Sequence, residues 1–259
     1  MGKTVLITGA TSGIGAAYAK KFASQGYDLI LTGRRQAIIQ KLADDLTKQY
    51  NIEVKVIIAE LSDDSDIQKV VDAIKHAEDL EILVNNAGYG GVPVLFAEKD
   101  PLEREKIMKV LMIVPLRLTY AALPEMTRKG HGTIISISSI AAFFPAGKWS
   151  IYSASKAFVK SFFESLYLEV KSSGIKVQIV CPGLISTDFS RDFSPDVKQN
   201  WASSFKVMMS PESVAECSMK DLGKNRVVCI PGAYYKRMAM LFSILPRSSL
   251  YKMIEKRAK

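Results

Sequence analysis

Short apolar runs alternate with longer amphipathic stretches along most of the chain. Several short runs consist almost entirely of Val, Ile and Leu, which is typical of strands that helices cover on both faces. This alternation predicts the α/β class with a doubly wound parallel sheet. The predicted strands are Thr4–Thr8, Leu29–Thr32, Glu53–Ala59, Ile82–Asn85, Thr133–Ser138, Lys176–Cys181 and Val227–Ile230.

Stretches with helical periodicity separate these strands, so helices should cover both sheet faces in a Rossmann-type three-layer sandwich. No repeat, low-complexity tract or long linker interrupts the pattern, and 259 residues suit one domain of this class, residues 1–259. In Ser210-Pro211, a capping hydroxyl and a first-turn proline mark a helix start. The predicted helices are Gly13–Gln25, Gln36–Tyr50, Ser65–Ala77, Glu103–Arg128, Ser150–Ser173 and Pro211–Leu222.

The least regular stretch, residues 184–209, follows the sixth predicted strand. Right-handed crossovers bring the carboxyl ends of the strands to one edge of the sheet, so this stretch is predicted to form a substrate lid there. Its aromatic and Met side chains either contact a lipophilic substrate or only pack the lid onto the core. They are Phe189, Phe193, Trp201, Phe205, Met208 and Met209.

The net charge of +9 is concentrated near the carboxyl terminus, where ten Lys and Arg residues accompany two acidic residues between Lys220 and Lys259. The rest of the chain is nearly neutral, which argues against a nucleic-acid-binding protein. Residues 234–259 form a basic segment that Pro246 divides into two short predicted helices. We expect this segment first to pack on a partner subunit or roof the substrate pocket, and second to rest on an anionic membrane surface.

Other features of the composition exclude several classes of protein. No apolar signal segment precedes the first strand, and no consecutive apolar run is long enough to span a membrane, so the expected location is cytoplasmic. Three cysteines without a CxxC pair, together with two histidines, predict free thiols and no metal site.

A glycine-rich turn, Thr8–Gly15, links the first predicted strand to the first helix. Gly9 permits a tight turn, Gly13 lets the backbone approach a pyrophosphate, and Gly15 lets helix and strand pack closely. The helix N-terminus supplies N–H groups and a partial positive charge for the phosphates. The turn therefore predicts a dinucleotide site, with further contacts from Thr11, Ser12 and Ile14.

Arg34 and Arg35 follow the second predicted strand, where NAD enzymes usually carry an acid that binds the ribose 2′-hydroxyl. A guanidinium group instead suits a 2′-phosphate, which it can bind bidentately. The pair predicts NADP(H) as the cofactor, the alternative being a solvated basic turn at a strand end.

Tyr152 and Lys156 lie four residues apart at the start of a predicted helix, so their side chains share one face. The ammonium should lower the pKa of Tyr152 toward working pH, which suits a group that donates and accepts a proton. Ser139 and Asn86 follow the fifth and fourth strands. Because the carboxyl ends of parallel strands share one edge, all four side chains should converge where the strand order reverses.

Five motifs occur in the order and spacing of the short-chain dehydrogenase/reductase family, which the chain resembles along nearly its whole length. The detailed pattern is similar to bacterial members of a DltE-like or ketoacyl-reductase-like branch. The resemblance implies an NADP(H)-dependent oxidoreductase that transfers a hydride between the nicotinamide and a ketone or secondary alcohol. It also implies a homodimer or homotetramer formed through the helices near residues 103 and 150. The motifs are TGxxxGIG at Thr8–Gly15, NNAG at Asn85–Gly88, Ser139, YSASK at Tyr152–Lys156 and Pro182-Gly183.

The resemblance also implies roles for individual residues. Tyr152 acts as the general acid and base, Lys156 bonds the nicotinamide ribose and tunes Tyr152, and Ser139 polarises the substrate carbonyl. The adenosine side of the cofactor is lined by Glu60, Leu61, Asn86, Ala87 and Gly88. The nicotinamide side is lined by Pro182, Gly183 and Thr187, with Thr187 at the carboxamide.

Two positions depart from the family pattern. Glu60 stands where the family usually has Asp near the adenine amino group, which keeps an acceptor with a longer reach. Leu111 stands where the family usually carries the asparagine of a Ser-Asn-Tyr-Lys tetrad, and a leucine cannot take part in a proton relay from Lys156. A catalytically weak dinucleotide-binding sensor or scaffold is therefore the alternative function.

Pro115 suggests how the chain compensates for Leu111. Proline has no N–H, so in a helix the carbonyl of Leu111, four residues earlier, lacks its usual donor and can hold a relay water. Pro115→Ala should then reduce kcat well beyond any loss of thermal stability, as measured by steady-state turnover beside thermal unfolding. A folded variant with unchanged turnover would contradict this hypothesis.

Overall fold

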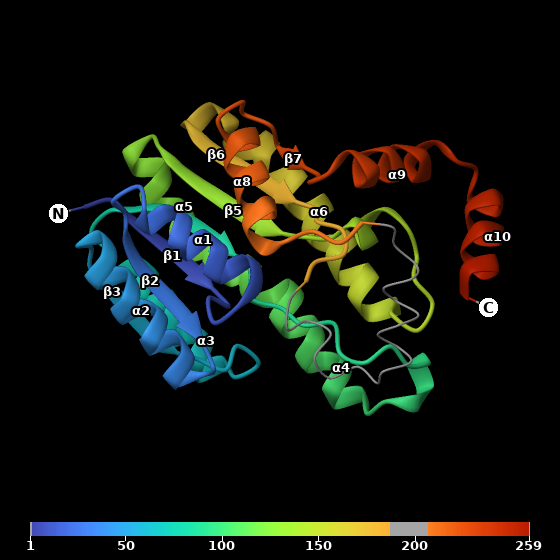
Figure 1. Ribbon diagram of the computed structural model, residues 1–259, viewed down its shortest axis with the longest axis horizontal. Coiled ribbons are helices and arrows are strands. Elements are labelled where there is room, and N and C mark those ends of the chain that lie inside the picture. Colours follow the sequence, from blue (N-terminus) through green and yellow to red (C-terminus); the bar gives the residue numbers. More distant parts are fainter. Residues whose placement is uncertain (1, 187–206, 259) are drawn as a thin grey trace.

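The computed structural model describes residues 2–186 and 207–258 (Figure 1). Their strands are β1 (Thr4–Thr8), β2 (Asp28–Gly33), β3 (Val54–Ile58), β4 (Leu80–Asn85), β5 (Gly132–Ile137), β6 (Ile175–Val180) and β7 (Val228–Cys229). All seven are parallel and form one sheet in the order β3-β2-β1-β4-β5-β6-β7. The strand order reverses between β1 and β4, which confirms the doubly wound topology and opens a crevice at their carboxyl ends.

Helices cover both faces of the sheet, so the single domain has the three layers that the sequence predicted (Figure 1). The helices are α1 (Gly13–Ala23), α2 (Gln36–Tyr50), α3 (Asp64–Lys75), α4 (Pro101–Met108), α5 (Val114–Lys129), α6 (Ser150–Val170), α8 (Pro211–Leu222), α9 (Ala233–Ile244) and α10 (Arg247–Ala258). One face is packed by α1, α2 and α8, and the other by α3, α5 and α6.

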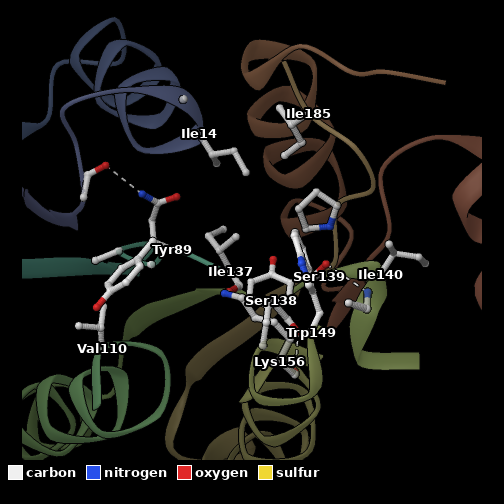
Figure 2. A pocket seen from close by; sticks show the side chains of 18 of the residues that line it. Ile14, Tyr89, Val110, Ile137, Ser138, Ser139, Ile140, Trp149, Lys156 and Ile185 are labelled. Carbon is white, nitrogen blue, oxygen red and sulfur yellow. Dashed lines mark hydrogen bonds between the residues drawn. The ribbon is translucent and has the colours of Figure 1, made fainter. Parts of the chain in front are cut away.

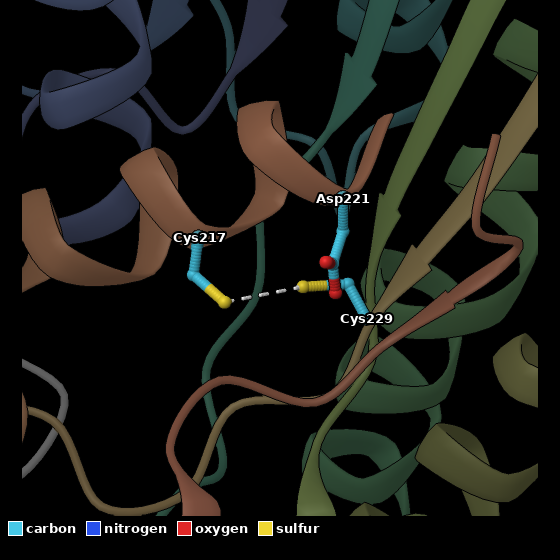
Figure 3. Close-up of side chains that lie close together, drawn as sticks. All are labelled: Cys217, Asp221 and Cys229. Carbon is cyan, nitrogen blue, oxygen red and sulfur yellow. Dashed lines mark hydrogen bonds between the residues drawn. The ribbon is translucent and has the colours of Figure 1, made fainter. Parts of the chain in front are cut away.

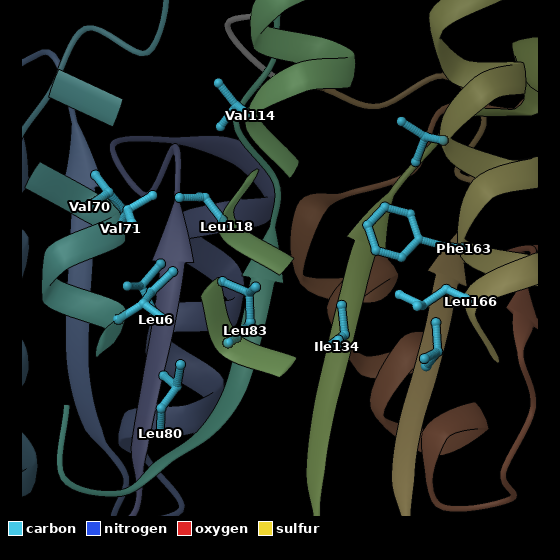
Figure 4. Close-up of a cluster of buried hydrophobic side chains, with 14 of the residues drawn as sticks. Leu6, Val70, Val71, Leu80, Leu83, Val114, Leu118, Ile134, Phe163 and Leu166 are labelled. Atoms are coloured by element: carbon cyan, nitrogen blue, oxygen red, sulfur yellow. The ribbon is translucent and has the colours of Figure 1, made fainter. Parts of the chain in front are cut away.

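Adjacent residues of a strand enter opposite halves of the core. In β1, Leu6 packs toward α3 and α5, while Val5 and Ile7 pack toward α1, and all three are fully buried. Figure 4 shows the half of the core on the α3, α5 and α6 face of the sheet. Leu6 and Leu118 lie in one part of it, and Phe163 lies near Ile134 further along the same face. Burial on both faces is the reason that the strands read as nearly continuous apolar runs.

The prediction of one regular helix over Glu103–Arg128 is wrong. A π-helical segment, η2 (Lys109–Ile113), separates α4 from α5, and the Val114 N–H donates to the Lys109 carbonyl five residues earlier. Pro115 follows directly and has no N–H, so the hydrogen-bond register changes at this proline. The other predicted boundaries agree with the structure to within about three residues, the usual uncertainty of element ends.

The continuous helical run Pro101–Lys129 also departs from the expectation that nothing could span a membrane. Among the described residues it is the one helix that is long and apolar enough by length and composition, with a mean hydropathy of 1.5 in an 18-residue window. Its buried side packs on α3, β4 and β5. It therefore serves as a core helix of this domain.

The carboxyl-terminal segment forms two helices with Pro246 between them, as predicted. The Ser213 N–H donates to the Ser210 hydroxyl at 3.2 Å, which confirms the predicted start of α8. The inner face of α9 packs on η3 (Ile140–Phe143) through a small apolar cluster. Beyond that contact, α9 and α10 extend away from the sheet (Figure 1).

Candidate active site

A cavity of about 1140 Å³ lies at the carboxyl edge of the sheet, where the strand order reverses. Its walls come from the turn after β1, from the ends of β2 to β6 and from α6, with α9 and α10 at one side. Figure 2 shows Ser139 and Lys156 on one side of this space and Ile14 and Tyr89 toward α1 and β4. The topology therefore gathers residues far apart in the sequence around one site.

The glycine-rich turn after β1 is held by the end of β4. Gly9 and Gly13 have φ angles of 69° and 58°, in the left-handed region that glycine adopts without penalty. The Asn86 side chain donates from Nδ2 to the carbonyls of Thr8 and Gly9, at 2.9 and 3.1 Å. Asn86 thus fixes the shape of the turn as well as lining the cavity.

Gly15 allows α1 to approach this turn closely. A β-carbon added at Gly15 would lie 2.6 Å from Asn86 Nδ2, closer than real side chains come. The structure therefore confirms the predicted packing role of Gly15. Because α1 begins at Gly13, and Gly13 and Ile14 line the cavity, the positive end of the helix dipole faces this space.

Arg35 is held across the same turn. Its Nη2 donates to Thr11 Oγ1 at 2.9 Å and to Ser12 Oγ at 2.7 Å. Both hydroxyls belong to the glycine-rich turn, so these bonds hold the guanidinium beside it. This position fits a phosphate partner that approaches from the cavity.

Arg34 has a different environment. Its Nη1 pairs with Glu60 Oε2 at 3.0 Å, and its guanidinium lies over the Tyr89 ring, 5.7 Å from the centroid. Burial acts to raise the pKa of Glu60, but hydrogen bonds from Arg34 and Ser62 outweigh it and hold this pKa below its usual range. The Glu60 carboxylate is therefore engaged by Arg34, a contact that the motifs did not indicate.

Ser139, Tyr152 and Lys156 converge at the other end of the cavity, as predicted. Ser139 forms a hydrogen bond with Tyr152 and accepts from the Ala141 N–H at 3.1 Å. Lys156 Nζ lies 5.7 Å from the centroid of the Tyr152 ring and donates to the Ile137 carbonyl at 2.8 Å. These bonds fix the hydroxyl and the ammonium relative to the ends of β5 and α6.

Burial governs the titration of this pair. It raises the pKa of Tyr152 to about 12, although the hydrogen bond with Ser139 acts in the opposite direction, and it lowers the pKa of Lys156 to about 8. The prediction that Lys156 brings the pKa of Tyr152 toward working pH is therefore wrong for this structure, because burial disfavours the phenolate and raises its pKa. Tyr152 keeps its proton at neutral pH.

Leu111 lies beside Lys156, at the position that the family resemblance implied. A β-carbon on Gly88 would come within 2.6 Å of Leu111 Cδ2 and 3.8 Å of Lys156 Nζ. An isobutyl group therefore stands next to the ammonium, and it neither donates nor accepts a hydrogen bond.

Comparison with known proteins identifies the family. Residues 3–198 match the family model described as short chain dehydrogenase. The chain belongs to the short-chain dehydrogenase family. Members of this family are oxidoreductases.

Two solved structures and one curated relative are similar to this short-chain dehydrogenase over most of their lengths. The very-long-chain 3-oxoacyl-CoA reductase of Anas platyrhynchos is 32% identical, over 100% of this chain and 81% of its own. A short-chain dehydrogenase from Sphingobium yanoikuyae in complex with NADPH is 30% identical, with a TM-score of 0.84 over 96% of this chain and 95% of its own. A Burkholderia phymatum member in complex with NAD is 23% identical, with a TM-score of 0.81 over 93% and 92%. At that identity the third comparison shows the shared fold alone.

Most of the predicted cofactor residues of this short-chain dehydrogenase line the cavity. Gly15 does not line it and contributes through packing. Thr187 and the aromatic residues of the predicted lid lie outside the described residues. The predicted cofactor residues that line the cavity are Gly9, Thr11, Ser12, Gly13, Ile14, Arg34, Arg35, Glu60, Leu61, Asn86, Ala87, Gly88, Tyr152, Lys156, Pro182 and Gly183.

Several cavity residues were not singled out from the sequence as site residues. Trp149 packs edge-on against Tyr152, with ring centroids 5.1 Å apart. Ser138, next to Ser139, instead donates to the Lys156 carbonyl at 2.7 Å and ties α6 to β5. The inner faces of α9 and α10 add Met238, Phe242, Met253 and Ile254. The amphipathic pattern of the tail was the signal for these four, and the prediction that it roofs the pocket is consistent with their position.

One cluster of potential metal ligands occurs among the described residues, away from the cavity. Cys217, Asp221 and Cys229 have ligand atoms within 4.8 Å of one another (Figure 3). Burial raises the pKa of the Cys229 thiol, so this thiol stays protonated, and Asp221 Oδ1 already pairs with Arg226 at 3.2 Å. These features favour a packed thiol pair, with the sulfur atoms 3.9 Å apart, over a preformed ion site.

Proposed function

We propose that this chain is an NADP(H)-dependent oxidoreductase that transfers a hydride between the nicotinamide and a lipophilic ketone or secondary alcohol. The observation that carries the proposal is the convergence of Ser139, Tyr152 and Lys156 on the cavity whose other end holds the glycine-rich turn. One end is suited to a dinucleotide phosphate, and the other to a carbonyl oxygen.

The residues at the first end fit a dinucleotide. The backbone of the turn can approach a pyrophosphate closely because Gly9, Gly13 and Gly15 have no side chains. The first turn of α1 offers a positive dipole end, and Arg35 adds a fixed charge beside Thr11. This charge supports NADP(H), whose 2′-phosphate a guanidinium binds better than a hydroxyl. The Sphingobium yanoikuyae relative in complex with NADPH agrees with this assignment.

The second end of the cavity has the groups that carbonyl reduction requires. When bound, the nicotinamide supplies or accepts the hydride. Ser139 donates a hydrogen bond to the carbonyl oxygen, and Tyr152 protonates the same oxygen as charge develops on it. A tyrosine with a pKa of about 12 holds its proton until the oxygen becomes strongly basic. Lys156, held on the Ile137 carbonyl, keeps its positive charge close to Tyr152.

The described walls near Tyr152 are largely apolar, which supports a lipophilic substrate. Trp149 contacts the Tyr152 ring, and α9 contributes Met238 and Phe242 to the same cavity. The Anas platyrhynchos relative is a reductase of very-long-chain 3-oxoacyl-CoA, a substrate of the same lipophilic kind. The substrate therefore combines a ketone with an extended apolar group.

Turnover of such substrates distinguishes an enzyme from the rival dinucleotide-binding sensor. We expect NADPH oxidation with long-chain or bulky ketones, followed as the loss of nicotinamide absorbance, and a decrease of at least about 100-fold in Tyr152→Phe. Tyr152→Phe should still bind NADPH, because it removes one hydroxyl. Binding without turnover in the wild type across the ketone panel would favour the sensor.

The choice of cofactor depends on the arginines after β2. Substitution of both, in Arg34→Ala/Arg35→Ala, should weaken NADPH binding by roughly 10- to 100-fold relative to NADH, since it removes charge-assisted hydrogen bonds to the 2′-phosphate. Fluorescence titration of both nucleotides gives the ratio. Arg34→Ala alone is the matched control, because Arg34 already pairs with Glu60. An unchanged ratio in the double variant would refute the NADP(H) assignment.

A second part of the proposal concerns α9, which has two apolar faces. Tyr235, Met238 and Phe242 face inward and are buried. Met240 and Ile244 lie on the outer face, 68% and 69% exposed, at the spacing of one helical turn. The outer face therefore offers an apolar strip with no covering element among the described residues.

The charges around this strip favour an anionic lipid surface over a second copy of the chain. Exposed Lys236, Arg237 and Arg247 flank it, and α9 contains no acidic residue. A symmetric contact between two such faces would bring these cations together, whereas an anionic surface would neutralise them. We propose that α9 rests on such a surface, with its inner face toward the substrate cavity.

Vesicle binding tests this contact. The protein should co-sediment with phosphatidylserine-containing vesicles at low salt, less so at high salt, and not with neutral vesicles. Met240→Ser/Ile244→Ser should weaken binding, whereas Met108→Ser, an exposed methionine on α4, should not. No binding to anionic vesicles at low salt would end the proposal.

A further inference from the structure

A short stretch of backbone after β6, residues 182–184, forms one wall of the large cavity. In the proposed function this wall lies on the nicotinamide side. Residues 207–209 run beside its end, where the Met209 N–H donates to the Leu184 carbonyl and the Ser186 N–H donates to the Met209 carbonyl, both at 3.0 Å. This bridge lies outside the main sheet, so the position of the wall depends on a few local contacts.

Tyr235, in the first turn of α9, supplies one of these contacts. Its hydroxyl accepts a hydrogen bond from the Leu184 N–H at 3.0 Å and donates one to the Val207 carbonyl. Burial raises the pKa of Tyr235, so the hydroxyl keeps its proton at neutral pH and can fill both roles. A single side chain of the carboxyl-terminal segment thus bridges two neighbouring stretches of backbone.

The Tyr235 ring packs against the same wall. A β-carbon added at Gly183 would overlap this ring, closer than real side chains come. Tyr235 is fully buried, and it is not among the residues that line the cavity. Any effect of Tyr235 on a bound cofactor therefore passes through the backbone of the wall.

The other end of the wall is attached next to Ser139. The Ile140 N–H donates to the Pro182 carbonyl at 2.9 Å. Ile140 directly follows Ser139, which forms a hydrogen bond with Tyr152. The wall is therefore held at Pro182 by the residue that follows Ser139, and at its far end by α9.

We propose that Tyr235 is a positioning residue for the nicotinamide end of the cofactor, because its hydroxyl fixes the backbone against which that end lies. The inference rests on the proposed function, which assigns residues 182–184 to the nicotinamide side. The glycine-rich turn and Arg35 lie at the other end of the cavity and make no hydrogen bond with Tyr235. Loss of the hydroxyl should therefore disturb the nicotinamide end and leave the adenosine end as it is.

Tyr235→Phe removes the hydroxyl and keeps the ring. The Leu184 N–H and the Val207 carbonyl then lose a buried partner, so the wall should loosen. In the protein without cofactor, the Leu184 amide should exchange its hydrogen at least about 10-fold faster, as measured by hydrogen–deuterium exchange. An unchanged exchange rate would show that the hydroxyl does not hold the wall, and the proposal would be wrong.

Nucleotide binding tests the two ends of the cofactor separately. The affinity for adenosine 2′,5′-bisphosphate, which has no nicotinamide, should be the same in the wild type and in Tyr235→Phe. The fluorescence anisotropy of fully bound NADPH reports the mobility of its nicotinamide ring, and it should decrease in the variant. Unchanged anisotropy, or a weaker affinity for the bisphosphate, would contradict a role confined to the nicotinamide end.

Turnover gives a third readout. In Tyr235→Phe, kcat for ketone reduction should fall by about 10- to 100-fold while the KM for NADPH changes little, since a small displacement of reacting groups costs that much in rate. The isotope effect on kcat with NADPH deuterated at the transferred position should increase, because hydride transfer becomes slower. A merely structural role would lower the melting temperature and leave kcat and the isotope effect unchanged, which would refute the proposal.

Tyr234→Phe is the matched control. It makes the same chemical change one residue earlier in α9 and keeps the ring contact with Tyr235, whose centroid is 5.1 Å away. Tyr234 does not line the cavity, and its hydroxyl has no hydrogen bond among the described residues. Amide exchange at Leu184, NADPH anisotropy and kcat should all match the wild type. Equal effects in both variants would mean that the Tyr235 hydroxyl is not their cause.

Gly183→Ala displaces the same wall while the Tyr235 hydroxyl remains, so it protects the test from a folding defect in Tyr235→Phe. The new methyl group overlaps the Tyr235 ring, and the wall must move to make room for it. The anisotropy of bound NADPH and kcat should again decrease, with an unchanged affinity for the bisphosphate. A folded Gly183→Ala protein with wild-type anisotropy and kcat would overturn the proposal.

The readouts separate this inference from the proposed function. If no ketone is reduced but the anisotropy of bound NADPH decreases in Tyr235→Phe, the proposed function fails and the positioning role stands. If ketones are reduced and Tyr235→Phe matches the wild type in exchange, anisotropy and kcat, the positioning role fails and the proposed function stands.

Discussion

The reversal of strand order between β1 and β4 is the constraint on which the rest of this molecule depends. Crossovers leave these two strands toward opposite sides, so no helix fills the space at their carboxyl ends. The glycine-rich turn, Arg34, Arg35 and Ser139 reach that space from strand ends, and α6, α9 and α10 bring side chains to it from its other walls. The close approach of α1 at Gly15 then brings the helix dipole to the same place.

Burial of Lys156 is the second constraint, and it follows from the first. The proposed reaction needs a cation near Tyr152, and the topology places Lys156 there, between α6 and the end of β5. Enclosure lowers the pKa of the ammonium to about 8, so it remains charged at neutral pH only by a small margin. The Leu111 side chain beside Nζ offers this ammonium no acceptor.

Much of this architecture follows from the sequence alone. Alternating apolar runs predict the seven strands because each is buried on both faces, and the spacing of Tyr152 and Lys156 predicts a shared helix face. The π-helical segment at residues 109–113 could not be predicted, since one turn of five residues is too short to show a period different from that of the flanking α-helices. The motifs also could not predict the pairing of Arg34 with Glu60, because the two residues lie 26 positions apart at the ends of neighbouring strands.

The pKa values of Tyr152 and Lys156 could not be predicted from the sequence either, for a physical reason. Neighbouring charge can be inferred from the spacing of Tyr152 and Lys156, but desolvation depends on everything that packs around them. Burial raises the pKa of the phenol and lowers that of the ammonium, because it disfavours the charged form of each group. A bound dinucleotide adds hydroxyl groups to this end of the cavity in the proposed function. In the proposed function Tyr152 is therefore an acid that keeps its proton at rest and gives it up only when the substrate oxygen beside it becomes basic enough to accept it.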